Sequence, residues 1–397
     1  MIKKKYTIIV LLIFTTCTIN FQKEGKEDIF TSFWDDCDII AQYNIIDGDT
    51  ILVCNTKNIK QRKIIPLELL VEDFEIIKLD SNVEEGWIDR RFPRVFFTDN
   101  YIAVGMAKKP VLLFQKDGTF LREVGKIGQG PGEFSLVDNL YLDENQNRIY
   151  ILPMTSKQVV LYDFEGAFLQ SIPLHEFVFM GSTLKVLPQD QLLITKAKGP
   201  GTEYCLWIQD FEGNVIKGIK SLDYFEESQT TAVGVMSKNT TNNIDFNMIG
   251  QHCEYHYDID QNRLKPVLRI EGEEGFGVIH EFPKHFIVQK TSAAPKADET
   301  IEAIIIDKET LKGCFFDGFQ LASSLVYNQY GMLFPIGGPY FFIADFGSEI
   351  LTSIQQMKQN NLSNNQMKEL DELKITIGDP LKYEQDDDVF LFKAKYK

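Results

Sequence analysis

Residues Gly125–Leu169 read GKIGQGPGEFSLVDNLYLDENQNRIYILPMTSKQVVLYDFEGAFL, and this stretch decides the fold. It contains short apolar segments separated by glycine-rich or polar runs that are typical of turns. The segments are Leu140–Asp143, Arg148–Leu152, Val159–Tyr162 and Phe168–Ile172. Because such segments are too short for a pair of helices, the pattern predicts a meander of four antiparallel β-strands.

A hairpin of strand, polar turn and strand recurs along the chain at nearly constant spacing. Its equivalent points are Gln115, Asp163, Asp210, Asp258 and Asp307. Successive points are 48, 47, 48 and 49 residues apart. A period of about 40–50 residues with four strands in each unit is the signature of β-propeller blades. A β-sandwich, the alternative for an all-β chain, does not require such regular spacing.

The repeat therefore predicts an all-β fold class, a six-bladed β-propeller of four-stranded blades. Five hairpins account for five blades. The two chain ends are expected to share the sixth, because an open ring would expose two sheet edges. The last strand is expected at Val389–Ala394. Apolar residues at helical spacing within Ser348–Leu373 predict short helices near the C-terminus.

The glycine-rich start of the repeat admits two interpretations. A phosphate-binding loop would need a helix directly after the glycines, whereas a strand follows here. A structural turn between blades fits better, with at least one glycine at positive φ and the phenylalanine buried between blades. The residues of this turn are Gly125, Gly128, Gly130, Gly132 and Phe134.

The stretch also resembles a known repeat. Its glycine-rich turn ending in Gly-Glu-Phe, its Asn-rich turn and its strand ending in Tyr-Asp-Phe-Glu-Gly are similar to an NHL repeat. The chain as a whole resembles the six-bladed propeller lipoproteins of bacterial envelopes, which share this loop and an acidic, strand-like C-terminal end. The resemblance implies a bacterial cell-envelope protein, an outer-membrane lipoprotein on its periplasmic or surface face. Pro153 departs from the repeat, which usually carries Asp there.

The N-terminus has the pattern of an export signal. Lys3–Lys5 form a basic region and Thr7–Phe14 a short apolar region, too short to span a bilayer. Thr15-Thr16-Cys17 then predicts a lipoprotein processing site, with lipid attached to Cys17. We thus expect a signal peptide at residues 1–17, a tether and N-terminal segment at 18–60, and the propeller at 61–397. Within the second part, Cys37–Ile40 and Thr50–Val53 are candidate edge strands.

Charge and cysteine content restrict the classes of partner. The net charge of −16 argues against nucleic acid, since phosphate binding needs a basic surface. Five cysteines follow Cys17, an odd number that rules out a complete set of disulfides. Cys205 and Cys253 occupy equivalent positions of neighbouring blades, where sheets about 10 Å apart are too distant for a disulfide. We expect these two to be buried free thiols.

The sequence predicts no metal site and no cofactor. His252 and His256 lie four residues apart on an expected strand, which separates them by about 13 Å at ~3.3 Å per residue, too far for one ion. Asp386–Asp388 lack the spacing and the turn glycine of an EF-hand calcium loop.

One group of cations is a candidate ligand-binding site. The loops between blades and the loops between second and third strands share one face of a propeller. An aromatic side chain and five cations fall in these loops, and on an acidic protein they could hold an anionic ligand such as an acidic glycan or a carboxylate. The alternative is that they are ordinary exposed charges. These residues are Trp87, Arg90, Arg91, Lys108, Lys109 and Lys157.

These observations favour an envelope-anchored propeller that serves as a non-catalytic scaffold binding a glycan, peptide or protein. The alternative is a lyase or hydrolase that acts on a glycan or peptide in the central channel, which rests on fold analogy alone. No catalytic residue stands out by spacing. A cluster of His and carboxylates lining the channel would favour the enzyme, and a broad charged or aromatic face without one would favour the scaffold.

Overall fold

The structure is a computed structural model of the 397-residue chain. The residues that it describes are 32–80, 94–106, 108–179, 181–196, 202–223, 235–236, 243–248, 252–272, 275–290, 302–321, 325–327, 336–337, 340–346, 367 and 389–397. Cys17, Trp87, Arg90 and Arg91 lie outside the described residues, as do the short helices expected within Ser348–Leu373 apart from Met367.

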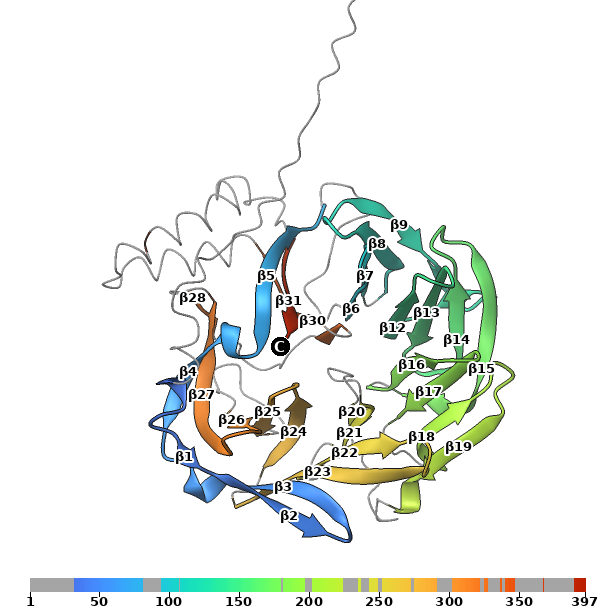
Figure 1. Ribbon diagram of the computed structural model, residues 1–397. Coiled ribbons are helices and arrows are strands. Elements are labelled where there is room, and N and C mark those ends of the chain that lie inside the picture. Colours follow the sequence, from blue (N-terminus) through green and yellow to red (C-terminus); the bar gives the residue numbers. More distant parts are fainter. Residues whose placement is uncertain are drawn as a thin grey trace, which may run out of the picture.

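Six sheets of at least four strands stand around a central axis as blades (Figure 1). Blade 1 comprises β6 (Arg94–Phe97), β7 (Tyr101–Gly105), β8 (Val111–Gln115) and β9 (Phe120–Val124). Blade 2 comprises β12 (Val137–Asp143), β13 (Arg148–Pro153), β14 (Ser156–Tyr162) and β15 (Phe168–Val178). Blade 3 comprises β16 (Thr183–Leu187), β17 (Gln191–Thr195), β18 (Tyr204–Gln209) and β19 (Val215–Lys220).

Blade 4 comprises β20 (Val235–Met236), β21 (Asp245–Met248), β22 (Cys253–Asp258) and β23 (Arg263–Glu271). Blade 5 comprises β24 (Phe276–Glu281), β25 (His285–Lys290), β26 (Ala303–Asp307) and β27 (Lys312–Leu321), with β28 (Leu325–Tyr327) beside β27. The sixth sheet, blade 6, comprises β29 (Ile336–Gly337), β30 (Tyr340–Phe346), β31 (Val389–Tyr396) and β5 (Val71–Lys78). The predicted all-β propeller is confirmed. Five blades are built from four consecutive strands, whereas the sixth is assembled from both ends of the chain.

The hydrophobic core is a closed ring of interfaces between neighbouring blades. Each interface is filled by one cluster of buried apolar side chains, and the clusters follow one another around all six blades. The third strand of a blade is covered on both faces, so β18 (YCLWIQ) is buried from its second residue to its last. Burial on both faces explains why such strands read as continuous apolar runs rather than alternating ones.

The recurrent turn that revealed the repeat has a clear local cause. Asp163, Asp210, Asp258 and Asp307 each end or follow the third strand of a blade. Each carboxylate accepts a backbone N–H from three or four residues further on, over 2.7 Å from Ala167, 2.8 Å from Asn214, 2.9 Å from Gln261 and 2.6 Å from Thr310. Asp favours such turns because its side chain bonds the nearby backbone. The predicted period is thus a period of turn-closing aspartates.

The glycine-rich stretch is a compact turn between blades 1 and 2. Lys126–Ile127 (β10) pairs in parallel with Glu133–Phe134 (β11). Gly125 and Gly132 have φ of 82° and 77°, as the turn interpretation requires. Phe134 is 2% exposed within the core between the two blades. The backbone N–H of Gly130 donates to Glu133 Oε2 over 2.8 Å, so a carboxylate of the chain itself occupies the position that a bound anion would take.

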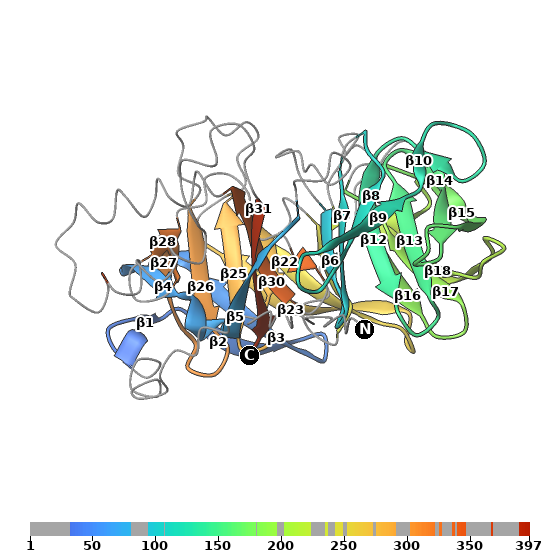
Figure 2. The same cartoon turned by 90° about the horizontal axis from the view of Figure 1, so that it is seen from above.

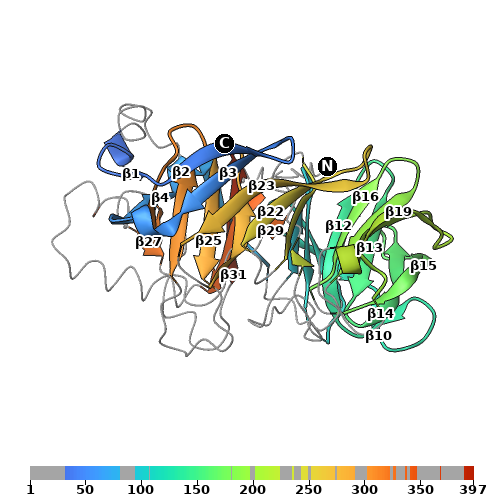
Figure 3. The same cartoon turned by 90° about the horizontal axis from the view of Figure 1, so that it is seen from below.

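The N-terminal segment extends the outer edges of two blades. β1 (Asp38–Ile39), β2 (Ala41–Ile46) and β3 (Asp49–Asn55) precede the 3₁₀ turn η1 (Thr56–Asn58), and β4 (Arg62–Pro66) precedes η2 (Leu67–Leu69). A third 3₁₀ turn, η4 (Ser221–Asp223), follows β19. β3 pairs in parallel with β23 of blade 4, whereas β1 and β4 pair with β27 of blade 5 (Figure 3). The predicted edge strand within Cys37–Ile40 is confirmed as β1, whereas Thr50–Val53 lies in β3, an inner strand between β2 and β23, so that prediction of an edge is wrong.

Blade 6 closes the ring. β31 from the C-terminus lies between β30 and β5, and it pairs antiparallel with both (Figure 2). Leu391 of β31 is opposite Ile77 of β5, and both belong to the core between blades 6 and 1. The prediction that the two chain ends share a sheet is confirmed.

The closing strand should therefore be essential for stability. We expect Leu391→Ala to lower the free energy of unfolding by about 2–5 kcal/mol, because it leaves a cavity in the closing interface. Lys395, on the same strand, is exposed, and Lys395→Ala should change stability by no more than about 0.5 kcal/mol. Thermal and urea denaturation of the two variants measures the difference. Equal stability of the two variants would show that closure by β31 contributes little.

Candidate functional site

The described members of the predicted cation group lie where the sequence places them. Lys108 and Lys109 form the turn between β7 and β8 of blade 1, and Lys157 is the second residue of β14 in blade 2. Lys108 and Lys157 are exposed, and Lys109 is half-buried. Successive turns of an antiparallel blade alternate between its two ends, so these second-to-third-strand turns share one face of the propeller. We call it the lysine face.

A buried aspartate joins three blades at this face. Asp138 of β12 has a fully buried side chain. Its Oδ1 accepts the N–H of Gly181 over 3.1 Å, and its Oδ2 accepts the N–H of Ser182 over 2.9 Å. Arg94 of blade 1, 41% exposed, donates from Nε to the Asp138 carbonyl over 2.8 Å and brings Nη2 to 3.5 Å from Oδ1. Burial raises the pKa of Asp138, although the N–H of Gly181 and the Arg94 charge act in the opposite direction.

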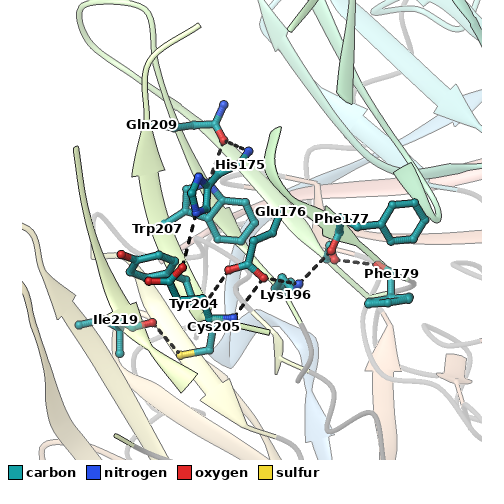
Figure 4. A network of polar contacts seen from close by, with 12 residues as sticks. His175, Glu176, Phe177, Phe179, Lys196, Tyr204, Cys205, Trp207, Gln209 and Ile219 are labelled. Atoms are coloured by element: carbon teal, nitrogen blue, oxygen red, sulfur yellow. Dashed lines mark hydrogen bonds and ion pairs between the residues drawn. The ribbon is translucent and has the colours of Figure 1, made fainter. Parts of the chain in front are cut away.

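A buried ion pair continues the same chain of contacts within blades 2 and 3. Lys196 follows β17, and its Nζ lies 2.8 Å from Glu176 Oε2 and 2.9 Å from the carbonyl of Phe177. The side chains of Lys196 and Glu176 are only 3% and 11% exposed. The other oxygen of Glu176 accepts the N–H of Tyr204 over 2.8 Å (Figure 4). Lys196 thus fixes the end of β15 against the start of β18.

Aromatic side chains surround this ion pair. The rings of Phe177 and Phe179 pack edge to face with centroids 5.2 Å apart, and Lys196 Nζ lies 5.7 Å from the centre of the Phe179 ring. Phe177 is 43% exposed. The carbonyl of Phe179 accepts the Ser182 hydroxyl over 2.7 Å, which links this cluster to Asp138. One polar network therefore runs from Arg94 to Tyr204 across three blades.

Further hydrogen bonds join β15 and β18 at Gln209. The indole N–H of Trp207 and the backbone N–H of His175 both donate to Gln209 Oε1, over 2.8 and 3.0 Å (Figure 4). Gln209 Nε2 donates to the Pro173 carbonyl over 2.8 Å. These bonds hold β15 against β18 and fix the strands beneath the lysine face.

His256 of blade 4 and His285 of blade 5 each contact a carboxylate from another chain segment. His256 Nε2 contacts Glu281 Oε2, and Lys308 Nζ lies 2.6 Å from the other oxygen of Glu281. Burial would raise the pKa of Glu281, but the hydrogen bond with His256 and the Lys308 charge outweigh it and lower the pKa. His285 Nε2 lies 3.2 Å from Asp307 Oδ2. In the described part of the chain, no three His, Cys, Asp or Glu side chains are grouped to hold a metal ion.

Sequence reasoning missed two lysines that belong to the lysine face. Lys196 directly follows the second strand of blade 3, and Lys290 ends the second strand of blade 5. They lie at the same face as Lys108 in the turn of blade 1 and Lys157 at the start of β14, but not at the same position of the blade. Lys290 Nζ lies 3.0 Å from Glu302 Oε2. Their carboxylate partners, Glu176 and Glu302, could not have been chosen among 57 acidic residues.

Comparison with protein families finds one match. The model of a domain of unknown function, DUF4934, matches residues 50–330, more than half of the chain. The chain belongs to this family. The matched region of the DUF4934 chain includes blades 1 to 5 and most of the candidate site. Comparison with curated proteins finds no match.

One solved structure supports the same architecture. A protein from Bacteroides fragilis NCTC 9343, described as predicted to be exported, is 14% identical to the DUF4934 chain. That alignment covers 87% of this chain and all of the other, with a TM-score of 0.56, and shows a shared fold. A member of the DUF4221 family from Bacteroides vulgatus ATCC 8482 is 9% identical, with a TM-score of 0.46 and coverage of 83% of this chain and 97% of its own. In the described residues, no helix is long and apolar enough to cross a membrane.

The buried ion pair predicts a clear pattern of stability changes. Lys196→Met should lower the free energy of unfolding by about 3 kcal/mol, because it leaves the Glu176 carboxylate buried without its cation. The double variant with Glu176→Gln should lose less than the sum of the two single changes, as expected for directly coupled groups. Lys157→Met, at an exposed lysine of the same face in blade 2, is the control and should change stability by at most about 0.5 kcal/mol. Additive effects in urea denaturation would contradict the coupling.

Proposed function

We propose that this protein is an envelope-anchored, extracytoplasmic propeller that binds an anionic ligand at its lysine face without transforming it. The observation that carries this proposal is that four blades of an acidic protein place lysines at one face, near the junction of the second and third strands. These are Lys108 and Lys109, Lys157, Lys196, and Lys290. With a net charge of −16, cations gathered on one face create a local field opposite to that of the molecule.

The lysines of this face divide into two kinds with different roles. Lys196 and Lys290 are paired with carboxylates and hold strands in place. Lys108 and Lys157 are exposed and stand on turns whose strands are fixed by the blade core. Binding groups carried on a rigid scaffold lose little freedom when a ligand binds. The exposed ring of Phe177 near the paired Lys196 adds an apolar surface to this face.

The ligand class follows from this chemistry. Ammonium groups are donors without an acceptor, so carboxylates and sulfates of a glycan or an acidic peptide are suitable partners. Trp87, Arg90 and Arg91, which lie in the sequence just before blade 1, remain proposed members of the site on sequence grounds alone. Nucleic acid is not proposed as a partner, because the chain as a whole repels phosphate.

Binding should depend on charge at the lysine face and not on net charge alone. We expect glycan and peptide arrays to select acidic members. Lys108→Glu with Lys157→Glu should then weaken binding of a selected ligand by about tenfold or more. Lys116→Glu with Lys284→Glu is the matched control, because both residues are exposed on turns at the opposite face and the change in net charge is equal.

Calorimetric titration of the two double variants distinguishes binding at the lysine face from an effect of net charge. Equal weakening by both would indicate non-specific attraction. An unchanged affinity of the Lys108 and Lys157 variant would place the ligand elsewhere.

We also propose that Cys17 carries the lipid that anchors the protein. The supporting observation is the basic region, apolar region and Thr15-Thr16-Cys17 order of the N-terminus. The fold shared with a Bacteroides protein described as predicted to be exported agrees with an extracytoplasmic location.

Lipid attachment can be tested directly in cells. The wild-type protein should incorporate a fatty-acid probe and sediment with membranes, whereas Cys17→Ala should lose the label and be released. Cys37→Ala is a control, because Cys37 lies in the folded part of the chain and should leave labelling unchanged. Equal labelling of the wild-type protein and Cys17→Ala would refute the proposed attachment.

A further inference from the structure

Two cysteines from distant parts of the sequence face each other at the edge of blade 5. β1 pairs antiparallel with β27, with Asp38 opposite Gly313 and Ile39 opposite Lys312. Extending this register by one residue places Cys37 opposite Cys314. Both thiols are free and buried, and a hydrogen bond joins them to each other. We propose that Cys37 and Cys314 form a disulfide under oxidising conditions and thereby lock the N-terminal segment onto the propeller.

The geometry of facing strands suits such a bond. Directly opposed residues of antiparallel strands have Cα atoms about 4.5–5.5 Å apart. A disulfide needs a Cα separation of about 4.4–6.8 Å, so the backbone need not move far. Cys205 and Cys253, by contrast, lie on β18 and β22 of two different blades. Among the described cysteines, only Cys37 and Cys314 are joined by register in this way.

The surroundings of the pair favour thiol chemistry. The hydrogen bond from Cys314 lowers the pKa of Cys37 to about 7, and the charge of Lys63 contributes in the same direction. Donating that hydrogen bond, together with burial, raises the pKa of Cys314. Burial raises the pKa of Cys54 and Cys205 to about 12. Cys37 is therefore the nucleophile of the pair, because thiolate is the reactive form.

The oxidation needs an external disulfide as oxidant, such as oxidised glutathione or the disulfide of a thiol oxidoreductase. The Cys37 thiolate attacks one sulfur of that disulfide, forms a mixed disulfide and releases the other sulfur as a thiolate. Cys314 then loses its proton and attacks the Cys37 sulfur, which releases the second thiol of the oxidant. Two electrons pass from the cysteine pair to the oxidant, which is reduced to two thiols that take up the protons.

Access to the pair requires only a local opening. Cys37 is 6% exposed and Cys314 is fully buried, so the oxidant reaches them when β1 separates from β27. β1 has two residues. The segment before it is held by Lys312 Nζ on the Trp34 carbonyl over 2.8 Å, by stacking of Trp34 on His285, and by Lys63 Nζ, which contacts the Asp36 carboxylate and the Phe33 carbonyl. Short elements at a sheet edge open more readily than inner strands. The disulfide then prevents this opening.

Oxidation of the full-length protein tests the proposal. Treatment of the native protein with oxidised glutathione, alkylation in denaturant and digestion should yield one linked peptide pair that contains Cys37 and Cys314. Titratable thiols should fall by two. Because the bond closes a loop of 277 residues, the melting temperature of the oxidised protein should exceed that of the reduced protein by roughly 5–15 °C.

Variants make the test specific. Cys37→Ser, a small change at a residue packed in the core between blades 5 and 6, should lose both the linked peptide and the rise in melting temperature. Cys205→Ala should retain both effects. Linkage of Cys37 to another cysteine, a dimer linked through Cys37, or full retention of free thiols after oxidation would overturn the proposal.

Discussion

Closure of the ring by β31 is the constraint on which the remaining structure depends. Each blade buries its two faces only against its neighbours, so a missing contact at one interface exposes apolar surface on both adjoining blades. β31 supplies the strand that joins β30 from late in the chain to β5 from its beginning. The fold is thus complete only when both ends have been placed. Five blades of consecutive strands can form by local pairing, but the sixth requires contact across more than 300 residues, as between Leu391 and Ile77. Such non-local contacts carry a large loop-closure entropy before they stabilise the fold.

The elements that the sequence predicts well are those with a local cause. The period could be read from Asp163, Asp210, Asp258 and Asp307 because each carboxylate closes a turn within its own four or five residues. The site is different, since its contacts depend on how blades meet. Nothing near Asp138 in the sequence indicates that it accepts the N–H groups of Gly181 and Ser182. Likewise Cys37 and Cys314 meet through strand register at a blade edge, and sequence spacing carries no trace of that register. The odd number of cysteines alone gave no reason to expect that Cys37 and Cys314 pair.

The polar network beneath the lysine face has an energetic consequence for function. Burying the charges of Lys196 and Glu176 is unfavourable unless hydrogen bonds offset the lost hydration. Here the ion pair is completed by the Phe177 carbonyl and the Tyr204 N–H, so the loss is offset only in one arrangement of β15 and β18. The same holds for Asp138, which is satisfied only when blades 1, 2 and 3 are correctly placed. These groups therefore contribute geometry more than net stability. They fix β12, β15 and β18 relative to one another at the face where the proposed binding residues lie.

The N-terminal segment lies at a different part of the ring from the exposed lysines. The segment lies along the outer edges of blades 4 and 5, whereas the exposed lysines belong to blades 1 and 2 on another part of the ring (Figure 1). The described part of the N-terminal segment therefore lies away from the turns of Lys108 and Lys157. Any pull from the N-terminal side would reach the contacts of Trp34 and Asp36 and then β1, whose two residues of pairing resist peeling poorly. A covalent bond between Cys37 and Cys314 would transfer that load to β27, which lies within a blade. The proposed attachment and the proposed binding would thus use separate parts of the ring.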